Sequence, residues 1–105
     1  YSFSLGDYFF AHAGAQPGVP LDRQDPQQLM WVRQAFLHHP DPFERVVIHG
    51  HTPAEAVHAD DRRIGLDTGA YATGVLTALR LEGEDRQLMQ TAVVGSQVTL
   101  SRRPL

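Results

Sequence analysis

The sequence contains no cysteine. Disulfide bonds and cysteine-ligated zinc sites are therefore excluded, but the redox compartment is not fixed. Lysine is absent as well, so all nine basic residues are arginine, a codon-dependent bias that is typical of a GC-rich genome and favours a bacterial source. The 12 acidic residues give a formal net charge of −3, which argues against a surface that binds nucleic acid.

Long apolar runs are also missing. No segment approaches the roughly 20 apolar residues that a membrane-spanning helix needs, and no basic stretch followed by an apolar one marks a signal peptide. We therefore expect a cytoplasmic protein without a membrane partner. Because the chain starts at Tyr1 rather than at a methionine, we also expect it to be a piece of a longer protein whose preceding part is missing here.

What the sequence does contain is the composition of one small globular domain. Its 105 residues are 42% hydrophobic and 20% charged, which suits a modest hydrophobic core and a single domain over residues 1–105. The six histidines are the one feature of the composition that indicates metal binding.

The order of apolar runs and turn residues predicts an α/β (α+β) chain, mostly strand with one clear helix. A buried strand is expected over residues 5–13, closed by Gly14. After a proline-rich loop, Asp25 is expected to cap a helix over residues 27–37, with Pro26 at its first position. The apolar stripe of this helix contains Leu29, Trp31 or Val32, and Phe36. Trp31 is most simply a core side chain.

The second half of the chain is expected to consist mainly of strands. The apolar run Val46-Val47-Ile48 predicts a strand over residues 45–49 that is covered on both faces. A loop is expected over residues 54–61, further strands over residues 63–67, 75–81, 87–94 and 98–101, and a frayed tail over residues 102–105. The order of strand, helix and several strands fits the second half of an α/β sandwich.

Three residues carry the chemistry that this pattern suggests: His12, Arg33 and His51. Each of the two histidines lies where a hydrophobic strand gives way to a glycine-containing turn, which is the edge at which α/β sheets bind ligands. Two neutral imidazoles from adjacent strand ends can bind one divalent cation. The planar, permanently charged guanidinium of Arg33 can hold two phosphate oxygens.

Each of these residues also has an ordinary interpretation. A histidine at a strand end is more often a hydrogen-bonded structural residue than a metal ligand. An arginine on an amphipathic helix is usually a solvated surface residue. Only the combination of the three therefore supports a site.

The other polar residues are less informative. If His49 belongs to the strand, it faces the same side as His51 and is a candidate for a supporting contact behind a metal ligand. Asp67, in Asp67-Thr68-Gly69, is expected to form a turn. Surface positions are expected for His38, His39 and His58.

Four segments occur in an informative order: Tyr8-Phe9-Phe10-Ala11-His12-Ala13-Gly14, Trp31-Val32-Arg33, residues 46–53 with His49-Gly50-His51-Thr52-Pro53, and Leu66-Asp67-Thr68-Gly69-Ala70 with Gly74. Together they cover most of residues 8–82. In this order they resemble the C-terminal portion of bacterial Ser/Thr protein phosphatases of the phosphoprotein phosphatase family, in the calcineurin-like metallophosphoesterase superfamily.

The resemblance implies that the chain is the C-terminal half of a calcineurin-like α/β/β/α sandwich. It implies that His12 and His51 are the histidine ligands of the second of two divalent metal ions, manganese, with iron or zinc as alternatives. It also implies that Arg33 grips the substrate phosphate.

The remaining ligands of such a site lie upstream in the family. They belong to Gly-Asp-x-His, Gly-Asp-x-x-Asp-Arg-Gly and Gly-Asn-His-Glu segments, none of which occurs in this sequence. We therefore expect the missing N-terminal half of the same domain to complete the site, and we expect the isolated chain to be inactive. We also expect it to self-associate, because removal of that half would expose strand edges and the apolar face around Phe9, Val47 and Ile48.

The resemblance implies a phosphoprotein substrate that carries phosphoserine or phosphothreonine. Other relatives have a second histidine where this sequence has Pro53. The proline therefore points to the protein phosphatases or to dinucleoside tetraphosphate hydrolases, which act on a nucleotide. A further alternative is a non-catalytic module that binds metal or phosphate or serves in association.

Overall fold

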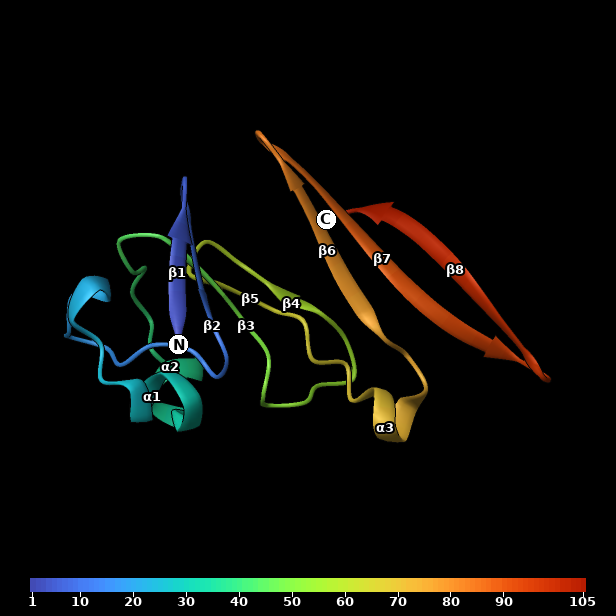
Figure 1. Cartoon of the computed structure of the whole chain (residues 1–105), viewed down its shortest axis with the longest axis horizontal. Helices are drawn as coiled ribbons and strands as arrows, with labels where there is room; N and C mark the ends of the chain where they lie inside the picture. Colours follow the sequence, from blue (N-terminus) through green and yellow to red (C-terminus); the bar gives the residue numbers. More distant parts are fainter. The chain divides into compact units, whose positions relative to one another are not determined.

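Two β-sheets and several short helices make up the computed structural model, which describes all 105 residues (Figure 1). The chain divides into two compact units. The first unit contains residues 1–52 and 58–65, and the second contains residues 53–57 and 66–105. The expected mixed class, mostly strand with little helix, is confirmed.

The elements of the first unit, in chain order, are β1 (Ser2–Leu5), β2 (Tyr8–Ala11), the 3₁₀ turn η1 (Leu21–Arg23), α1 (Pro26–Trp31), α2 (Gln34–Leu37), β3 (Val46–His49), β4 (His58–Ala59) and β5 (Arg63–Gly65). Those of the second unit are α3 (Ala70–Thr73), β6 (Thr77–Glu82), β7 (Asp85–Val94) and β8 (Gln97–Pro104). The short helix α3 and the two-residue strand β4 were not expected from the sequence.

The sheet of the first unit has the strand order β1-β2-β3-β5-β4. Its three inner strands are parallel, with Phe9 opposite Val47 and Ile48 opposite Ile64. The outer strands β1 and β4 run antiparallel to their neighbours. The apolar run of β3 therefore occupies the centre of the sheet, as its composition predicts.

The strand expected over residues 5–13 is wrong in its extent. The chain instead forms a hairpin, because Gly6 and Asp7 make a two-residue turn between β1 and β2, and Gly6 has a φ of +56°. The strand β2 ends at Ala11. His12 therefore lies just outside the strand, in the segment that leads to the helices.

The single helix expected over residues 27–37 is also wrong. Asp25 caps α1 as expected, since its carboxylate accepts a hydrogen bond of 2.9 Å from the Gln27 amide. The chain then leaves helical geometry at Val32 and at Arg33, where φ is −131° and ψ is −98°, and α2 follows. The break turns Trp31 outward, so that the expected core tryptophan is 63% exposed.

The main hydrophobic cluster of the first unit lies on one face of its sheet, and Ile48 and Ile64 are buried on the opposite face. The cluster is built from Phe9 and Val47 of the sheet, from residues of the two helices, and from the segment between β2 and α1: Ala13, Ala15, Leu21, Leu29, Val32 and Phe36. Gly14 has a φ of +144°, and a β-carbon at this position would lie 2.3 Å from Cδ2 of Phe36. Only glycine therefore permits this close approach of the chain to the helix α2.

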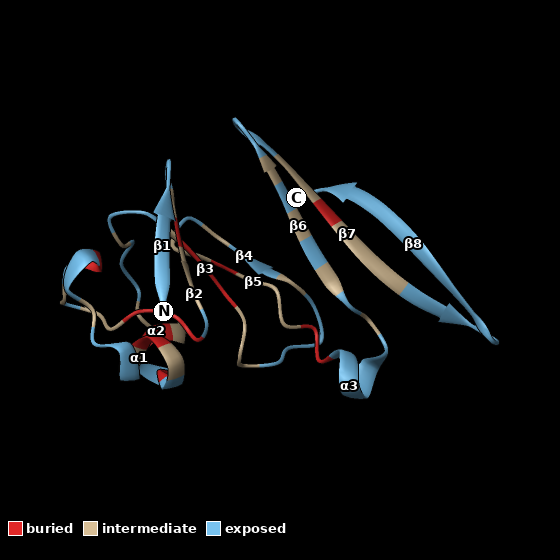
Figure 2. Ribbon diagram, viewed as in Figure 1, coloured by how far each residue is buried: buried red, intermediate tan, exposed pale blue.

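The second unit contains a three-stranded antiparallel sheet in the order β6-β7-β8. Thr77 pairs with Gln90, and Val93 pairs with Val98. The strand β8 extends to Pro104, so the expected frayed tail is wrong. Leu88, which is 1% exposed, is the one buried apolar residue of this unit (Figure 2).

The expectation of an exposed apolar face around three sheet residues is wrong, because Phe9, Val47 and Ile48 are all buried. Exposed apolar side chains elsewhere include two on β1 and three on β7 and β8: Phe3, Leu5, Val93, Val98 and Leu100. None of the helices combines the length and the apolar character that crossing a membrane requires.

Candidate metal centre

The two candidate metal ligands lie at the ends of neighbouring parallel strands. His12 follows β2 directly, and His51 follows β3 after Gly50. Since parallel strands end at the same edge of a sheet, the pairing of β2 with β3 brings the two histidines together. The structure therefore places the two histidines side by side, while their role as metal ligands stays a prediction.

The two rings face each other through nitrogen atoms. Nε2 of His12 lies 3.1 Å from Nδ1 of His51, and the ring centroids are 4.8 Å apart. Two nitrogens that bind one zinc-like ion at about 2.0–2.1 Å, with roughly 100° between the bonds, are also about 3.1 Å apart. The pair therefore fits a divalent cation, and it also fits a direct hydrogen bond in which one ring donates to the other.

Gly50 connects the two histidines through its peptide groups. Its amide donates a hydrogen bond of 2.8 Å to the carbonyl oxygen of His12, and its own carbonyl oxygen accepts one of 2.8 Å from the Thr52 amide. Between these residues His51 takes a φ of +69°, the left-handed region that costs free energy for residues other than glycine. The turn therefore holds His51 in a conformation that an isolated chain would seldom adopt.

Trp31 is an exposed aromatic residue next to His51. The edge of its ring meets the ring of His51 at an interplanar angle of 89°, with the centroids 5.6 Å apart. The indole thus borders the histidine pair while most of its surface remains open to solvent. Only the break between α1 and α2 places it there, and no pattern in the sequence indicates that break.

His49 lies behind the pair in a buried position, 4% exposed. Its Nδ1 is 3.1 Å from the Gly50 carbonyl oxygen, and its Nε2 is 3.0 Å from Nη1 of Arg63. Phe36 meets the ring edge-on at 4.9 Å. Both nitrogens are therefore engaged, and His49 is placed to support the turn rather than to bind a metal ion itself.

The surroundings of His49 favour its neutral form. Burial lowers the pKa of His49 from 6.5 to about 4, and the positive charge of Arg63 acts in the same direction, while the hydrogen bond to Gly50 opposes the shift. An arginine can only donate a hydrogen bond. Nε2 of His49 therefore accepts, and the single ring proton lies on Nδ1.

Arg33 lies at the break between α1 and α2. It is exposed at the start of α2, and its carbonyl oxygen accepts the amides of Phe36 and Leu37. Its guanidinium makes no hydrogen bond or ion pair within the chain. Its expected role toward a phosphate stays a prediction.

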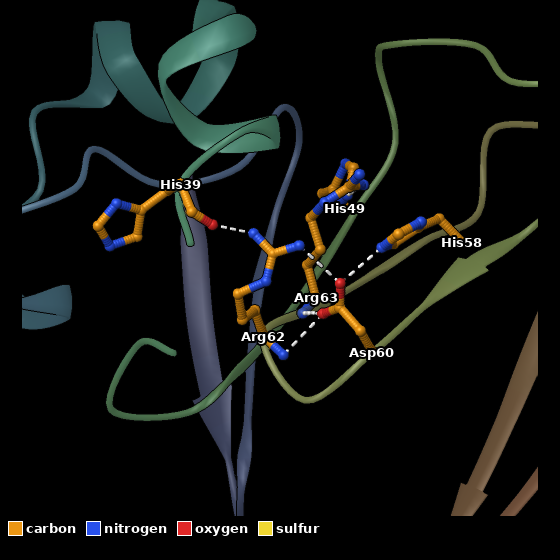
Figure 3. Close-up of polar contacts among 6 residues, drawn as sticks. All are labelled: His39, His49, His58, Asp60, Arg62 and Arg63. Atoms are coloured by element: carbon orange, nitrogen blue, oxygen red, sulfur yellow. Dashed lines mark hydrogen bonds and ion pairs between the residues drawn. The ribbon is translucent and has the colours of Figure 1, made fainter. Parts of the chain in front are cut away.

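Sequence reasoning missed a polar cluster around Asp60 (Figure 3). One carboxylate oxygen of Asp60 accepts the amides of Arg62 and Arg63 at 2.8 and 2.9 Å. The other accepts Nε2–H of His58 at 2.6 Å and Nη2–H of Arg62 at 2.7 Å. Arg62 also donates to the carbonyl oxygen of His39.

These donors decide the charge of Asp60. Partial burial raises the pKa of Asp60, but the hydrogen bonds from His58 and from the amides of Arg63 and Arg62 outweigh it, and the pKa lies well below its ordinary value. The run Asp60-Asp61-Arg62-Arg63 was the only signal in the sequence, and such a run is ordinarily a solvated surface segment.

Asp67 forms a turn, as expected: its carboxylate accepts the Gly69 amide at 3.0 Å. Beyond the histidine pair, no group of three or more histidine, cysteine or carboxylate side chains gathers in a way that could hold a metal ion. Of the candidate ligands, the chain therefore brings together only His12 and His51. Comparisons of the chain with family models, with curated proteins and with solved structures gave no match.

Proposed function

We propose that the chain is part of a two-metal phosphoesterase of the calcineurin-like superfamily that hydrolyses phosphoserine and phosphothreonine in proteins. The observation that carries this proposal is the distance of 3.1 Å between Nε2 of His12 and Nδ1 of His51 at the carboxyl ends of β2 and β3. Such a pair offers two neutral nitrogen ligands on one side of a divalent ion, which manganese, iron and zinc all accept.

The remaining ligands belong, in this proposal, to a preceding segment of the same domain. Two bound divalent ions would lower the pKa of a water and stabilise charge on the phosphate oxygens. Within the chain, His12 and His51 hold one ion, and the turn at Gly50 fixes their relative position. Arg33, whose guanidinium is exposed and has no partner in the chain, binds two phosphate oxygens through its planar fork.

A metal titration of activity in the protein that carries the preceding segment tests these roles. His51→Ala should weaken metal binding, so that activity recovers partly at high Mn²⁺. Arg33→Ala should leave metal affinity nearly unchanged and lower kcat/KM by roughly 10²–10³-fold, as for other lost transition-state donors. His38→Ala, an exposed histidine at the end of α2, is the control and should do little. Rescue of Arg33→Ala by metal, with no rescue of His51→Ala, would reverse the two assignments.

A dinucleoside tetraphosphate hydrolase is the second candidate, and the exposed Trp31 beside His51 favours it. A nucleobase that stacks on an aromatic side chain gains about 1–3 kcal/mol. A phosphoserine peptide and diadenosine tetraphosphate, assayed side by side, separate the candidates. Trp31→Ala should raise KM for the dinucleotide about tenfold or more if the base stacks there, and it should leave a phosphopeptide substrate nearly unaffected.

A non-catalytic metal-binding module is the third candidate, because the chain offers only two ligands. We expect the isolated chain to hydrolyse p-nitrophenyl phosphate no faster than a blank, with or without Mn²⁺. If the longer protein also binds Mn²⁺ through His12 and His51 without any turnover, the metal-binding module replaces the enzyme as the best account.

A further inference from the structure

Arg63 is a cation in an unusual position. It is the first residue of β5 and pairs with Val47 at the centre of the sheet. Its guanidinium lies over the ring of Phe36, with Cζ 6.0 Å from the ring centroid, and its Nε is buried without a hydrogen-bond partner. Burial of this Nε–H donor without a partner costs free energy.

The contacts of Arg63 lead toward the histidine pair. Nη1 of Arg63 donates to Nε2 of His49, whose Nδ1–H then donates to the carbonyl oxygen of Gly50. The amide of Gly50 donates in turn to the carbonyl oxygen of His12. A continuous series of hydrogen bonds therefore runs from the guanidinium to the turn that carries both candidate ligands.

The backbone of Arg63 is held by the Asp60 cluster. The Arg63 amide donates to Asp60, and the carboxylate of Asp60 is held by His58 and Arg62 (Figure 3). These contacts fix the backbone of Arg63 at the start of β5, and the side chain of Arg63 extends from there to His49. Arg62 shares this anchor but donates to the His39 carbonyl oxygen, so the two neighbouring arginines have separate tasks.

We infer that Arg63 is a positioning residue for the His12–His51 pair. By donating to Nε2 of His49 it keeps the ring proton on Nδ1, where that proton holds the Gly50 carbonyl group. Gly50 in turn keeps His51 in its left-handed conformation, with Nδ1 directed at His12. That the pair binds a divalent metal ion rests on the proposed function. The positioning of His12 and His51 by Arg63 does not depend on it. Groups that orient a ligand from behind commonly change metal affinity when they are removed.

Nuclear magnetic resonance of the metal-free chain at pH 7 tests the positioning directly. In the wild type, long-range ¹H–¹⁵N correlations should show His49 as the neutral tautomer with the proton on Nδ1. A wild-type His49 protonated on Nε2 would overturn the inference whether or not any variant folds. Arg63→Met keeps the length of the side chain and removes the donors. It should shift His49 away from the Nδ1–H form. Hydrogen exchange of the Gly50 amide should become about tenfold faster, which corresponds to losing the stabilisation of about one hydrogen bond.

Arg62→Met is the matched control, because Arg62 has the same charge and binds the same carboxylate without touching His49. It should leave the His49 tautomer and the exchange of Gly50 near their wild-type values, because Asp60 still accepts the Arg63 amide and the His58 side chain when the Arg62 side chain is lost. Arg63→Lys restores a cationic donor and should recover part of the Nδ1–H population. Equal effects of Arg62→Met and Arg63→Met would mean that Arg63 serves only the general stability of the loop, and the inference would fall.

Titration of the same variants with Co²⁺ or Zn²⁺, followed through the His12 and His51 resonances, separates this inference from the proposed function. Arg63→Met should weaken binding about 10–100-fold, as for other supporting contacts, and Arg62→Met should not. If the wild type binds metal and Arg63→Met binds it equally well, positioning by Arg63 is refuted. If the tautomer responds as expected while the histidines show no metal contact even in the longer protein, the inference stands and the proposed metal site fails.

Discussion

The β-sheets of the two units differ in how far other elements cover them. The first unit packs helices α1 and α2 on a mixed sheet whose three inner strands are parallel, and it contains every buried apolar side chain of the protein except Leu88. The second unit is mainly an antiparallel ribbon, and all eight residues of β8 are exposed. Parallel strands need cover on both faces, whereas antiparallel strands tolerate solvent.

The two units also differ in the chemistry of their side chains. All six histidines lie in the first unit. The pair His12 and His51, the buried His49 and the cluster around Asp60 therefore depend on one packed core. A site that must hold two side chains within a fraction of an ångström needs rigid support, and only the first unit offers it. Three changes test how far the two units differ, in order of decreasing effect.

Phe36→Ala should produce the largest loss. The ring is 0% exposed and packs against Phe43, His49 and the glycine at position 14. Truncation of such a side chain leaves a cavity and should lower the free energy of unfolding by about 3–5 kcal/mol. Urea denaturation followed by Trp31 fluorescence measures this loss. Tyr71→Ala, at a residue of the second unit that is 87% exposed, should change stability by less than about 0.5 kcal/mol, and equal losses at both positions would contradict the comparison.

Acidification should destabilise the first unit through His49. The folded pKa is about 4 and the ordinary value is 6.5. Between these values the unfolded chain takes up a proton that the folded chain does not, so stability falls as the pH decreases from about 7 to 4. At about 1.4 kcal/mol for each pKa unit, the loss approaches 3 kcal/mol. Denaturation in the presence of EDTA at several pH values measures it.

His49→Gln should remove most of this pH dependence, whereas His38→Gln, at an exposed residue, should keep it. The second unit has no histidine. Hydrogen exchange at pH 5 should therefore show weaker protection in β2 and β3 and little change in β6 and β7. Loss of protection that begins in β7 would contradict the comparison.

Leu88→Ala should give the smallest and most local of the three losses. It removes the one buried apolar side chain of the second unit, at a cost of about 2–3 kcal/mol, the lower part of the range for such truncations. The effect should appear as faster hydrogen exchange in β6, β7 and β8, with β3 unchanged. If β3 loses protection equally, the two units unfold as one and the distinction drawn here is wrong.

The elements that the sequence predicted well are those with a local signature. The apolar run of β3, the cap at Asp25 and the strand expected over residues 75–81 each depend on nearby residues alone. The meeting of His12 and His51 could also be predicted, because both follow a strand and a parallel sheet gathers its carboxyl ends at one edge. Nothing further was needed to bring these two rings together.

The features that were missed depend on contacts between distant residues. The helix breaks at Val32 and Arg33 without a proline or glycine, so the break follows from burial of Leu29, Val32 and Phe36 rather than from propensity. That break is also what exposes Trp31. The carboxylate of Asp60 becomes important only because a tight turn gathers Arg62 and Arg63 around it, and a run of charges gives no sign of that turn.

The strand order of the two sheets also has a consequence for the time course of folding. Strands β6, β7 and β8 are neighbours in sequence and in the sheet, and hairpins of this kind close in about 1–10 μs. The pairing of β2 with β3 must first close the segment of residues 12–45, and such non-local pairing slows folding. His12 and His51 depend on that pairing, so we expect the ribbon to form early and the histidine pair to be among the last features that the folding chain acquires.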